Sequence, residues 1–123
     1  MYENGKIYMG LADGARVELA LNMCNRHGLI AGASGTGKTI TMKVMAESFS
    51  DAGVPVFLCD VKGDVAGICA PGVSSEGMEK RIDKFGLRDR FVYQGYPTTF
   101  WDVYQEGGHA VRATVSDMGP ELL

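Results

Sequence analysis

Residues 32–39 read Gly32-Ala33-Ser34-Gly35-Thr36-Gly37-Lys38-Thr39 and fit the pattern G-x-x-x-x-G-K-[ST] of a phosphate-binding loop. The glycines let the backbone wrap closely around a phosphate, and the wrapped N–H groups form an anion nest. A helix that begins beside the loop adds the positive end of its dipole. Lys38 would place a point charge on the β- and γ-phosphates, and the Thr39 hydroxyl is a hard oxygen ligand suited to Mg²⁺. The motif therefore predicts nucleotide binding, with Lys38 as the catalytic candidate and nucleotide contacts from Gly32, Ala33, Ser34, Gly35, Thr36, Gly37, Lys38, Thr39 and Ile40.

The segments that flank the loop agree with this interpretation. A short apolar strand, Leu29-Ile30-Ala31, is predicted before the loop, and a helix over about 38–50 is predicted after it. Gly53 and Pro55 follow that helix in the order typical of a stop signal. The apolar run 54–60 predicts a strand of a parallel sheet covered on both faces. Together these segments predict a right-handed βαβ unit.

The remaining elements are predicted from turns and apolar spacing. Residues 6–21 are predicted to form a β-hairpin around Asp13-Gly14. A loop with one helical turn is expected over 61–75, and an amphipathic helix over 76–85 that Gly86 closes. A short strand is expected at 91–93, and a second hairpin from 98–104 and 109–115.

The predicted fold is therefore α/β, with a three-layer P-loop core that is preceded and followed by β-hairpins. Residues 1–24 would be the first hairpin and its connector. Val56 and Phe57 are expected to expose apolar surface.

Composition sets the outer bounds. The chain has 123 residues, 46% hydrophobic and 22% charged, which is typical of a globular domain. Its net charge of −3 excludes a uniformly basic nucleic-acid binder. Three cysteines without paired spacing argue against a disulfide framework, and neither a signal peptide nor a membrane-length apolar run is visible. A cytoplasmic location is expected.

A second candidate site is Asp60-Val61-Lys62-Gly63-Asp64. Asp60 could be a Walker B acid that holds Mg²⁺ through water, or part of a D-x-x-G motif as in GTPases. It could also be only a strand-end acid beside a Lys-Gly turn. For four other residues a structural role is favoured over a functional one. His27 is expected to bond to the backbone where a strand begins, and Arg112 to lie on a solvated face. Trp101 and Tyr104 are expected to lie in the core or to cover it, rather than to stack on bases.

Several stretches resemble the bacterial HerA-like branch of the FtsK–HerA P-loop ATPases. They cover 25–39, 54–58, 60–64, 100–104, 111–116 and Gly119-Pro120. The resemblance implies ATP and Mg²⁺ at Gly32 to Thr39, a homo-hexameric ring that moves or unwinds DNA, and a possible nuclease partner. It also implies that Asp60 is an accessory residue rather than the main metal-binding acid.

The same resemblance leaves parts of an ATPase unaccounted for. In that family the Walker B strand and the arginine finger would lie beyond Leu123. The resemblance therefore implies that residues 25–123 are the N-terminal part of a P-loop ATPase domain, with an incomplete RecA/ASCE-like P-loop NTPase core. The chain is accordingly expected to be the N-terminal piece of a larger ATPase. Three functions stay open: an ATP-driven DNA translocase or helicase subunit, another P-loop enzyme such as a GTPase or nucleotide kinase, and a nucleotide-binding fragment that is inactive alone.

Overall fold

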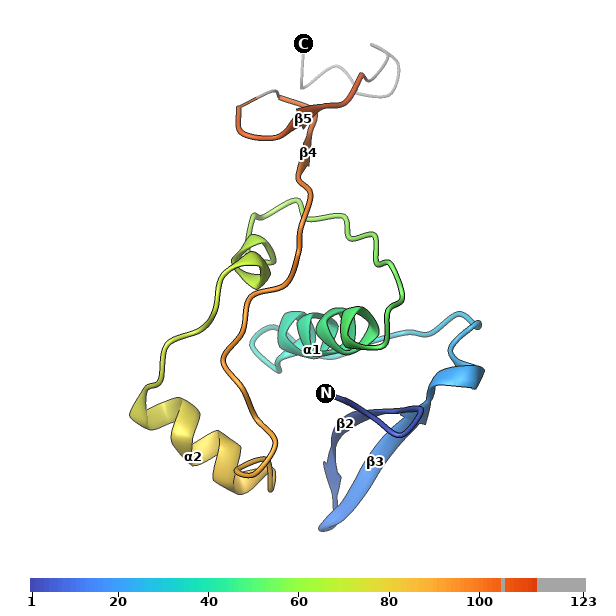
Figure 1. Ribbon diagram of the computed structural model, residues 1–123, viewed down its shortest axis with the longest axis vertical. Coiled ribbons are helices and arrows are strands. Elements are labelled where there is room, and N and C mark those ends of the chain that lie inside the picture. Colours follow the sequence, from blue (N-terminus) through green and yellow to red (C-terminus); the bar gives the residue numbers. More distant parts are fainter. Residues whose placement is uncertain (105, 113–123) are drawn as a thin grey trace.

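The computed structural model describes residues 1–104 and 106–112, and it places two helices beside a small antiparallel sheet (Figure 1). The sheet has the strand order β1-β2-β3. The first half of the chain contains β1 (Tyr2–Glu3), β2 (Lys6–Ala12), β3 (Ala15–Ala20), the 3-10 turn η1 (Leu21–Met23) and α1 (Lys38–Asp51). The second half contains the 3-10 turn η2 (Ala66–Cys69), α2 (Glu76–Lys84), β4 (Trp101–Asp102) and β5 (His109–Ala110).

The first hairpin is confirmed. Strands β2 and β3 pair antiparallel, and Ala12 lies opposite Ala15, so Asp13 and Gly14 form a two-residue turn. Both turn residues have positive φ, 50° and 78°, as a type I′ turn requires. Asp tolerates this conformation and Gly adopts it without a steric penalty. For this reason the Asp-Gly dipeptide predicts a hairpin turn.

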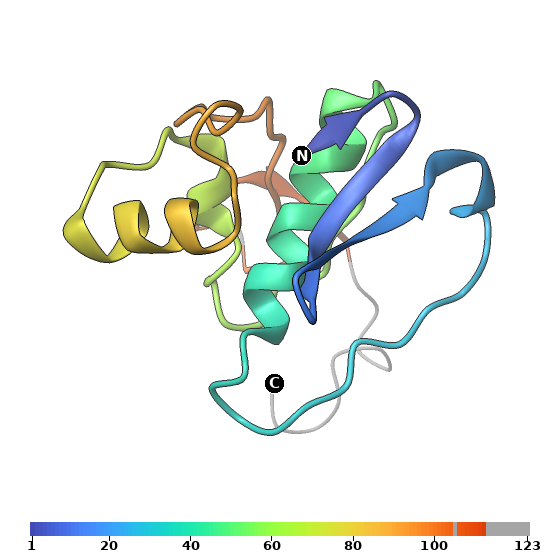
Figure 2. The ribbon, with the colours of Figure 1, turned by 90° about the horizontal axis from the view of Figure 1, so that it is seen from below.

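The helix after the glycine-rich loop is also confirmed. Helix α1 ends in a Schellman motif, in which Val54 N–H donates to Phe49 O and Gly53 N–H donates to Ser50 O, both at 2.9 Å. Gly53 has φ of 76°, a conformation that a side chain would disfavour. Helix α1 packs against β1 and β2 (Figure 2), and Ser48 is fully buried on that helix.

Helix α2 confirms the amphipathic helix predicted over 76–85. Ser75 caps its start by accepting a hydrogen bond from Met78 N–H at 3.3 Å. Gly86 closes its end in a second Schellman motif, in which Leu87 N–H donates to Ile82 O at 2.9 Å. Ile82 is 5% exposed and is the buried anchor of this helix.

Long-range hydrogen bonds connect these elements. Tyr8 on β2 is 6% exposed, and its hydroxyl donates to Phe85 O at the end of α2, at 3.0 Å. Residues 93–96 run back beside η2 (Figure 1), where Tyr96 N–H donates to Ile68 O at 3.0 Å. A Cβ at Gly95 would lie 2.5 Å from Cys69 O, so this crossing requires glycine. The predicted loop over 61–75 with one helical turn is confirmed by η2.

The three predicted apolar strands are wrong as secondary structure. Residues 29–31, 54–60 and 91–93 carry no strand ladder, so the βαβ unit does not form within the described residues. Leu29 is 88% exposed, Phe57 81% and Val92 69%. A parallel strand is stable only beside a hydrogen-bonded neighbour and under a covering layer, and here each run lacks both. The exposed apolar surface expected at Val56 and Phe57 is confirmed, at 41% and 81%.

The second hairpin is wrong as well, and its residues 113–115 lie outside the described residues. Strands β4 and β5 pair parallel, with Trp101 opposite His109. The Asp102 carboxylate accepts the N–H groups of Tyr104, Glu106 and Gly107, which curls the connection back across β4. Trp101 and Tyr104 are 64% and 62% exposed, so the prediction that they are core or cover residues is also wrong. The confirmed fold class is therefore a small α/β arrangement of two sheets and two helices.

Candidate functional site

In the loop that leads into α1, each of the three motif positions requires glycine for a structural reason. Gly35 and Gly37 have φ of 79° and 95°, which residues with a side chain rarely adopt. Gly32 has a different reason, because a Cβ there would lie 2.6 Å from the hydroxyl oxygen of Thr36. The backbone at Gly32 therefore packs directly against the Thr36 side chain, and this contact makes the loop tight.

The Lys38 side chain folds back over the loop that precedes it. Its ammonium donates to Gly32 O at 2.8 Å and to Ala33 O at 2.6 Å. Thr36 reinforces the turn, since its hydroxyl donates to Ala33 O at 2.8 Å. The positive charge is therefore held against the backbone of the loop rather than extended into solvent.

The start of α1 supplies backbone donors at the same place. Gly37 is the N-cap, and the first helical turn closes when Thr41 N–H donates to Gly37 O at 2.9 Å. The N–H groups of Lys38, Thr39 and Ile40 consequently have no acceptor within the helix. No acidic residue lies in this first turn, so no carboxylate of the helix itself competes for these donors. An ammonium and a helix N-terminus together form an electropositive anchor for an anion.

The donor set at the loop fits magnesium that arrives with a phosphate ligand. Thr39 is half-buried in the first turn of α1 and offers one hydroxyl oxygen. Mg²⁺ commonly takes one or two protein oxygens and completes its octahedron with phosphate oxygens and water. Among the residues that the structure describes, no group of three His, Cys, Asp or Glu side chains could hold a metal alone.

Asp60 organises its own loop. Its carboxylate accepts Gly63 N–H at 2.9 Å and Val65 N–H at 2.8 Å, and a longer bond of 3.3 Å from Lys62 N–H. The bond from Val65 is the main cause of a lowered pKa at Asp60, followed by those from Gly63 and Lys62. This geometry is nearest to the acid beside a Lys-Gly turn, although no strand precedes it. The accessory role of Asp60 near a nucleotide stays a prediction, as does the backbone-bonded role of His27.

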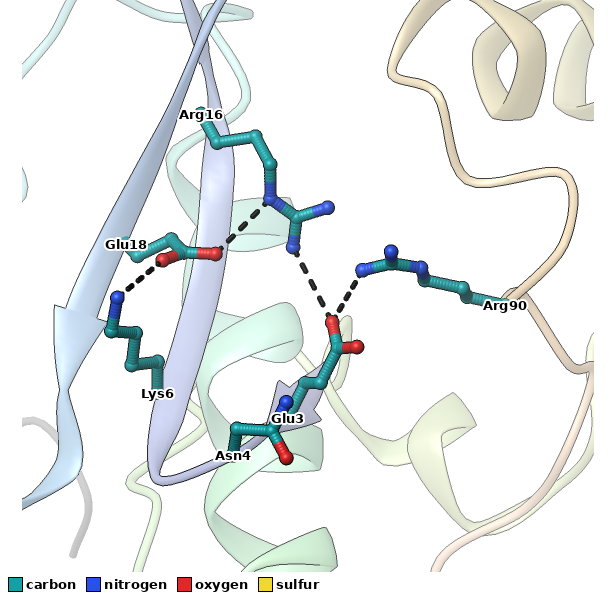
Figure 3. Close-up of a pocket in the computed structure, with 6 residues that line it drawn as sticks. All are labelled: Glu3, Asn4, Lys6, Arg16, Glu18 and Arg90. Atoms are coloured by element: carbon teal, nitrogen blue, oxygen red, sulfur yellow. Dashed lines mark hydrogen bonds and ion pairs between the residues drawn. The ribbon is translucent and has the colours of Figure 1, made fainter.

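The structure also contains a charged hollow of about 290 Å³, which the sequence analysis did not predict (Figure 3). It lies between the N-terminal sheet and the chain that follows α2, and it is lined by Glu3, Asn4, Lys6, Arg16, Glu18 and Arg90. The only local signal was the spacing of Arg16 and Glu18, which places both side chains on one face of β3. Arg90 lies 72 residues further along the chain than Glu18, and only the fold brings it there.

Ion pairs cross this hollow. Glu18 Oε2 accepts a hydrogen bond from Lys6 Nζ, and Glu18 Oε1 accepts one from Arg16 Nε, each at 3.1 Å. The bond from Lys6 is the largest cause of a lowered pKa at Glu18, and the bond from Arg16 is the next. Arg16 and Arg90 both approach the same oxygen of Glu3, Oε2, with Arg16 at 3.6 Å. Arg112, by contrast, is exposed outside any strand, in agreement with its predicted solvated face.

Comparison with known proteins gives one family. The family model described as helicase HerA-like C-terminal matches residues 7–123. No curated protein and no solved structure matches the chain. The family is described as C-terminal, and the assignment of residues 25–123 to the N-terminal part of an ATPase domain stays a prediction. Over the described residues, neither helix has the length and apolar character needed to cross a bilayer.

Proposed function

Because this chain belongs to the helicase HerA-like C-terminal family, we propose that residues 32–40 bind ATP with Mg²⁺. In this proposal the chain is the nucleotide-binding part of a HerA-like DNA translocase or helicase. The family membership supports the helicase context, and the loop motif and its geometry support the nucleotide.

The position of the Lys38 ammonium is the observation that carries the proposal. It lies against the carbonyl oxygens of Gly32 and Ala33, in the loop that leads into the first turn of α1. A triphosphate in this place would give the ammonium charged acceptors instead of neutral carbonyls. Charge-assisted hydrogen bonds are roughly twice as strong as neutral ones, so the exchange favours the bound state. The N–H groups of Lys38, Thr39 and Ile40 would receive phosphate oxygens at the positive end of the helix.

Magnesium would bind through the Thr39 hydroxyl and the phosphate oxygens. When bound it neutralises charge between the β- and γ-phosphates. Thr39 lies on the first turn of α1, directly after Lys38, and this position supports the proposal. Asp60 keeps the accessory role that the resemblance implies, and the backbone hydrogen bonds that hold its carboxylate, from Val65 first, lower its pKa.

Turnover is proposed to need more than this site. Phosphoryl transfer depends on a group that orients the attacking water and on charges that stabilise the transition state. The site assembled here supplies Lys38, the backbone donors and Thr39, which bind and position phosphates. We therefore expect the 123-residue chain to bind ATP weakly with negligible hydrolysis, and we expect the ATPase, the homo-hexamer, DNA and a nuclease partner to belong to the whole protein. Hydrolysis that disappears in Lys38→Ala would contradict the first part.

Calorimetric titration with Mg-ATP tests the binding proposal. Lys38→Ala should weaken binding by tenfold or more, since a charged hydrogen bond to phosphate contributes about 1.5–3 kcal/mol. Lys43→Ala is the matched control, because it removes the same charge from the same helix outside the motif. Equal affinities of the parent and Lys38→Ala would refute the site.

The choice of base separates the remaining alternatives. A GTPase would prefer GTP over ATP, and a nucleotide kinase would bind a second nucleotide as phosphoryl acceptor. The sequence carries no N-K-x-D string for guanine, so ATP is proposed. A titration in which GTP binds clearly more tightly than ATP would favour the GTPase.

A further inference from the structure

The charged hollow between the N-terminal sheet and Arg90 combines open space with unbalanced charge. Its lining includes three cations, Lys6, Arg16 and Arg90, and two carboxylates, Glu3 and Glu18. The cations are exposed by 36–56%, so a solute can reach them. Ordinary surface ion pairs contribute little to stability, which makes stability a weak reason for collecting five charges here.

The two arginines converge on one atom. Arg16 comes from β3 and Arg90 from the chain after α2, yet both guanidinium groups approach Glu3 Oε2 (Figure 3). Guanidinium groups recognise oxyanions with several oxygens best, because each can donate two parallel bonds. One carboxylate oxygen shared by two guanidinium groups therefore uses only part of their donor capacity. Glu3 Oε2 marks the place where an oxygen of an anionic ligand would sit.

Glu3 is the more exposed of the two carboxylates in the cluster. It lies on β1, a two-residue edge strand, and its side chain is 44% exposed. Glu18, in contrast, is held by Lys6 and Arg16 on its two oxygens. When Glu3 turns outward, the three cations and Glu18 leave a net charge of +2 around the hollow. A phosphate dianion complements that charge.

We propose that this hollow, lined by Lys6, Arg16 and Arg90, is a binding site for a phosphate dianion that displaces the carboxylate of Glu3. The site is separate from residues 32–40 and shares no residue with them. Inorganic phosphate and a terminal phosphate monoester carry the required chemistry. A phosphodiester has one charge and fewer free oxygens, and it should bind less well.

Arginine side-chain NMR of the Lys38→Ala chain tests the site, because this background removes the charge of the glycine-rich loop. Inorganic phosphate should shift the Nε signals of Arg16 and Arg90 saturably, and sodium chloride at the same ionic strength should not. Dimethyl phosphate, the diester arm, should bind at least fivefold more weakly. Equal shifts with chloride, or equal binding of the diester, would overturn the proposal.

Two variants give opposite expectations. Glu3→Gln removes the competing carboxylate and should tighten phosphate binding by about tenfold, whereas Arg90→Gln should weaken it by about tenfold. Arg81→Gln on α2 is the matched control and should change nothing. A purely structural ion-pair network predicts no phosphate binding in any variant, and the Glu3→Gln result stays decisive if Arg90→Gln fails to fold. The phosphate site and the ATP site can fail independently. Absence of phosphate binding at the hollow with ATP binding retained would refute only the hollow, and absence of ATP binding with phosphate binding retained would refute only the site at 32–40.

Discussion

The Lys38 ammonium donates to the carbonyl oxygen of Gly32 at 2.8 Å, and so joins the first turn of α1 to the first residue of the glycine-rich loop. The bond spans six residues and needs no other part of the chain. It closes the loop into the shape in which Gly32 passes against Thr36. The contacts that shape the candidate nucleotide site are therefore local in the sequence.

Gly32→Ala should abolish that shape by a specific collision. The new Cβ would lie 2.6 Å from Thr36 Oγ1 but 3.6 Å from Thr36 Cβ, so only the hydroxyl is too close. We expect Gly32→Ala to weaken Mg-ATP binding by about tenfold, equivalent to about 1.4 kcal/mol. The double variant Gly32→Ala/Thr36→Ala should recover most of the loss, as measured by calorimetric titration. Gly35→Ala is the control, since its defect comes from φ of 79° and removal of the Thr36 hydroxyl should not rescue it.

The end of α1 should be sensitive to its glycine. Gly53→Ala places a Cβ on a residue with φ of 76° and should lower the free energy of unfolding by about 1–2 kcal/mol. Gly77→Ala is the matched change in the first turn of α2, where no atom lies within 4 Å of the new Cβ. It should raise the free energy of unfolding by about 0.5 kcal/mol through a less flexible unfolded chain. Urea denaturation measures the free energy of unfolding of both variants. Changes of the same sign would contradict the conclusion that the positive φ of Gly53 makes an alanine there unfavourable.

The Tyr8 hydroxyl should contribute to the stability of the whole arrangement. It connects β2 to Phe85 O, 77 residues further along the chain, and the side chain is nearly buried. Tyr8→Phe removes the donor and should cost about 1 kcal/mol in urea unfolding. Tyr2→Phe, at a residue 37% exposed on the edge strand, should change stability much less. Equal effects would mean that the hydroxyl bond does not hold the sheet to α2.

Acid should weaken the contacts between α2 and Arg88. Hydrogen bonds from Ser74 first and from Arg88 next lower the pKa of Glu79, and Arg88 is the main cause of the lowered pKa of Asp83. A carboxyl with a lowered pKa stabilises the fold above its ordinary pKa, and this contribution is lost as pH falls through the lowered value. Stability should therefore fall as pH drops below about 4. Carboxyl NMR titration should show both pKa values rising towards ordinary values in Arg88→Gln, while Arg81→Gln leaves them unchanged.

Local features could be predicted from neighbouring residues because their hydrogen bonds close within a few positions. Both helices, their glycine ends and the Asp13-Gly14 turn depend on contacts of this kind. The apolar runs at 29–31 and 54–60 looked like strands for an equally local reason, their composition. A strand, however, exists only by its partner, and the described structure gives these runs none.

The amino-acid sequence by itself determined the two helices and the first hairpin, which the structure confirms, and it predicts the nucleotide site at 32–40. Tertiary structure alone decided that β4 and β5 pair parallel, that Trp101 is exposed, and that Arg90 meets Glu3. The physical reason is the range of the interactions. A helix end or a tight turn is stabilised by residues a few positions apart, whereas an ion pair between positions 3 and 90 exists only after the intervening chain has folded.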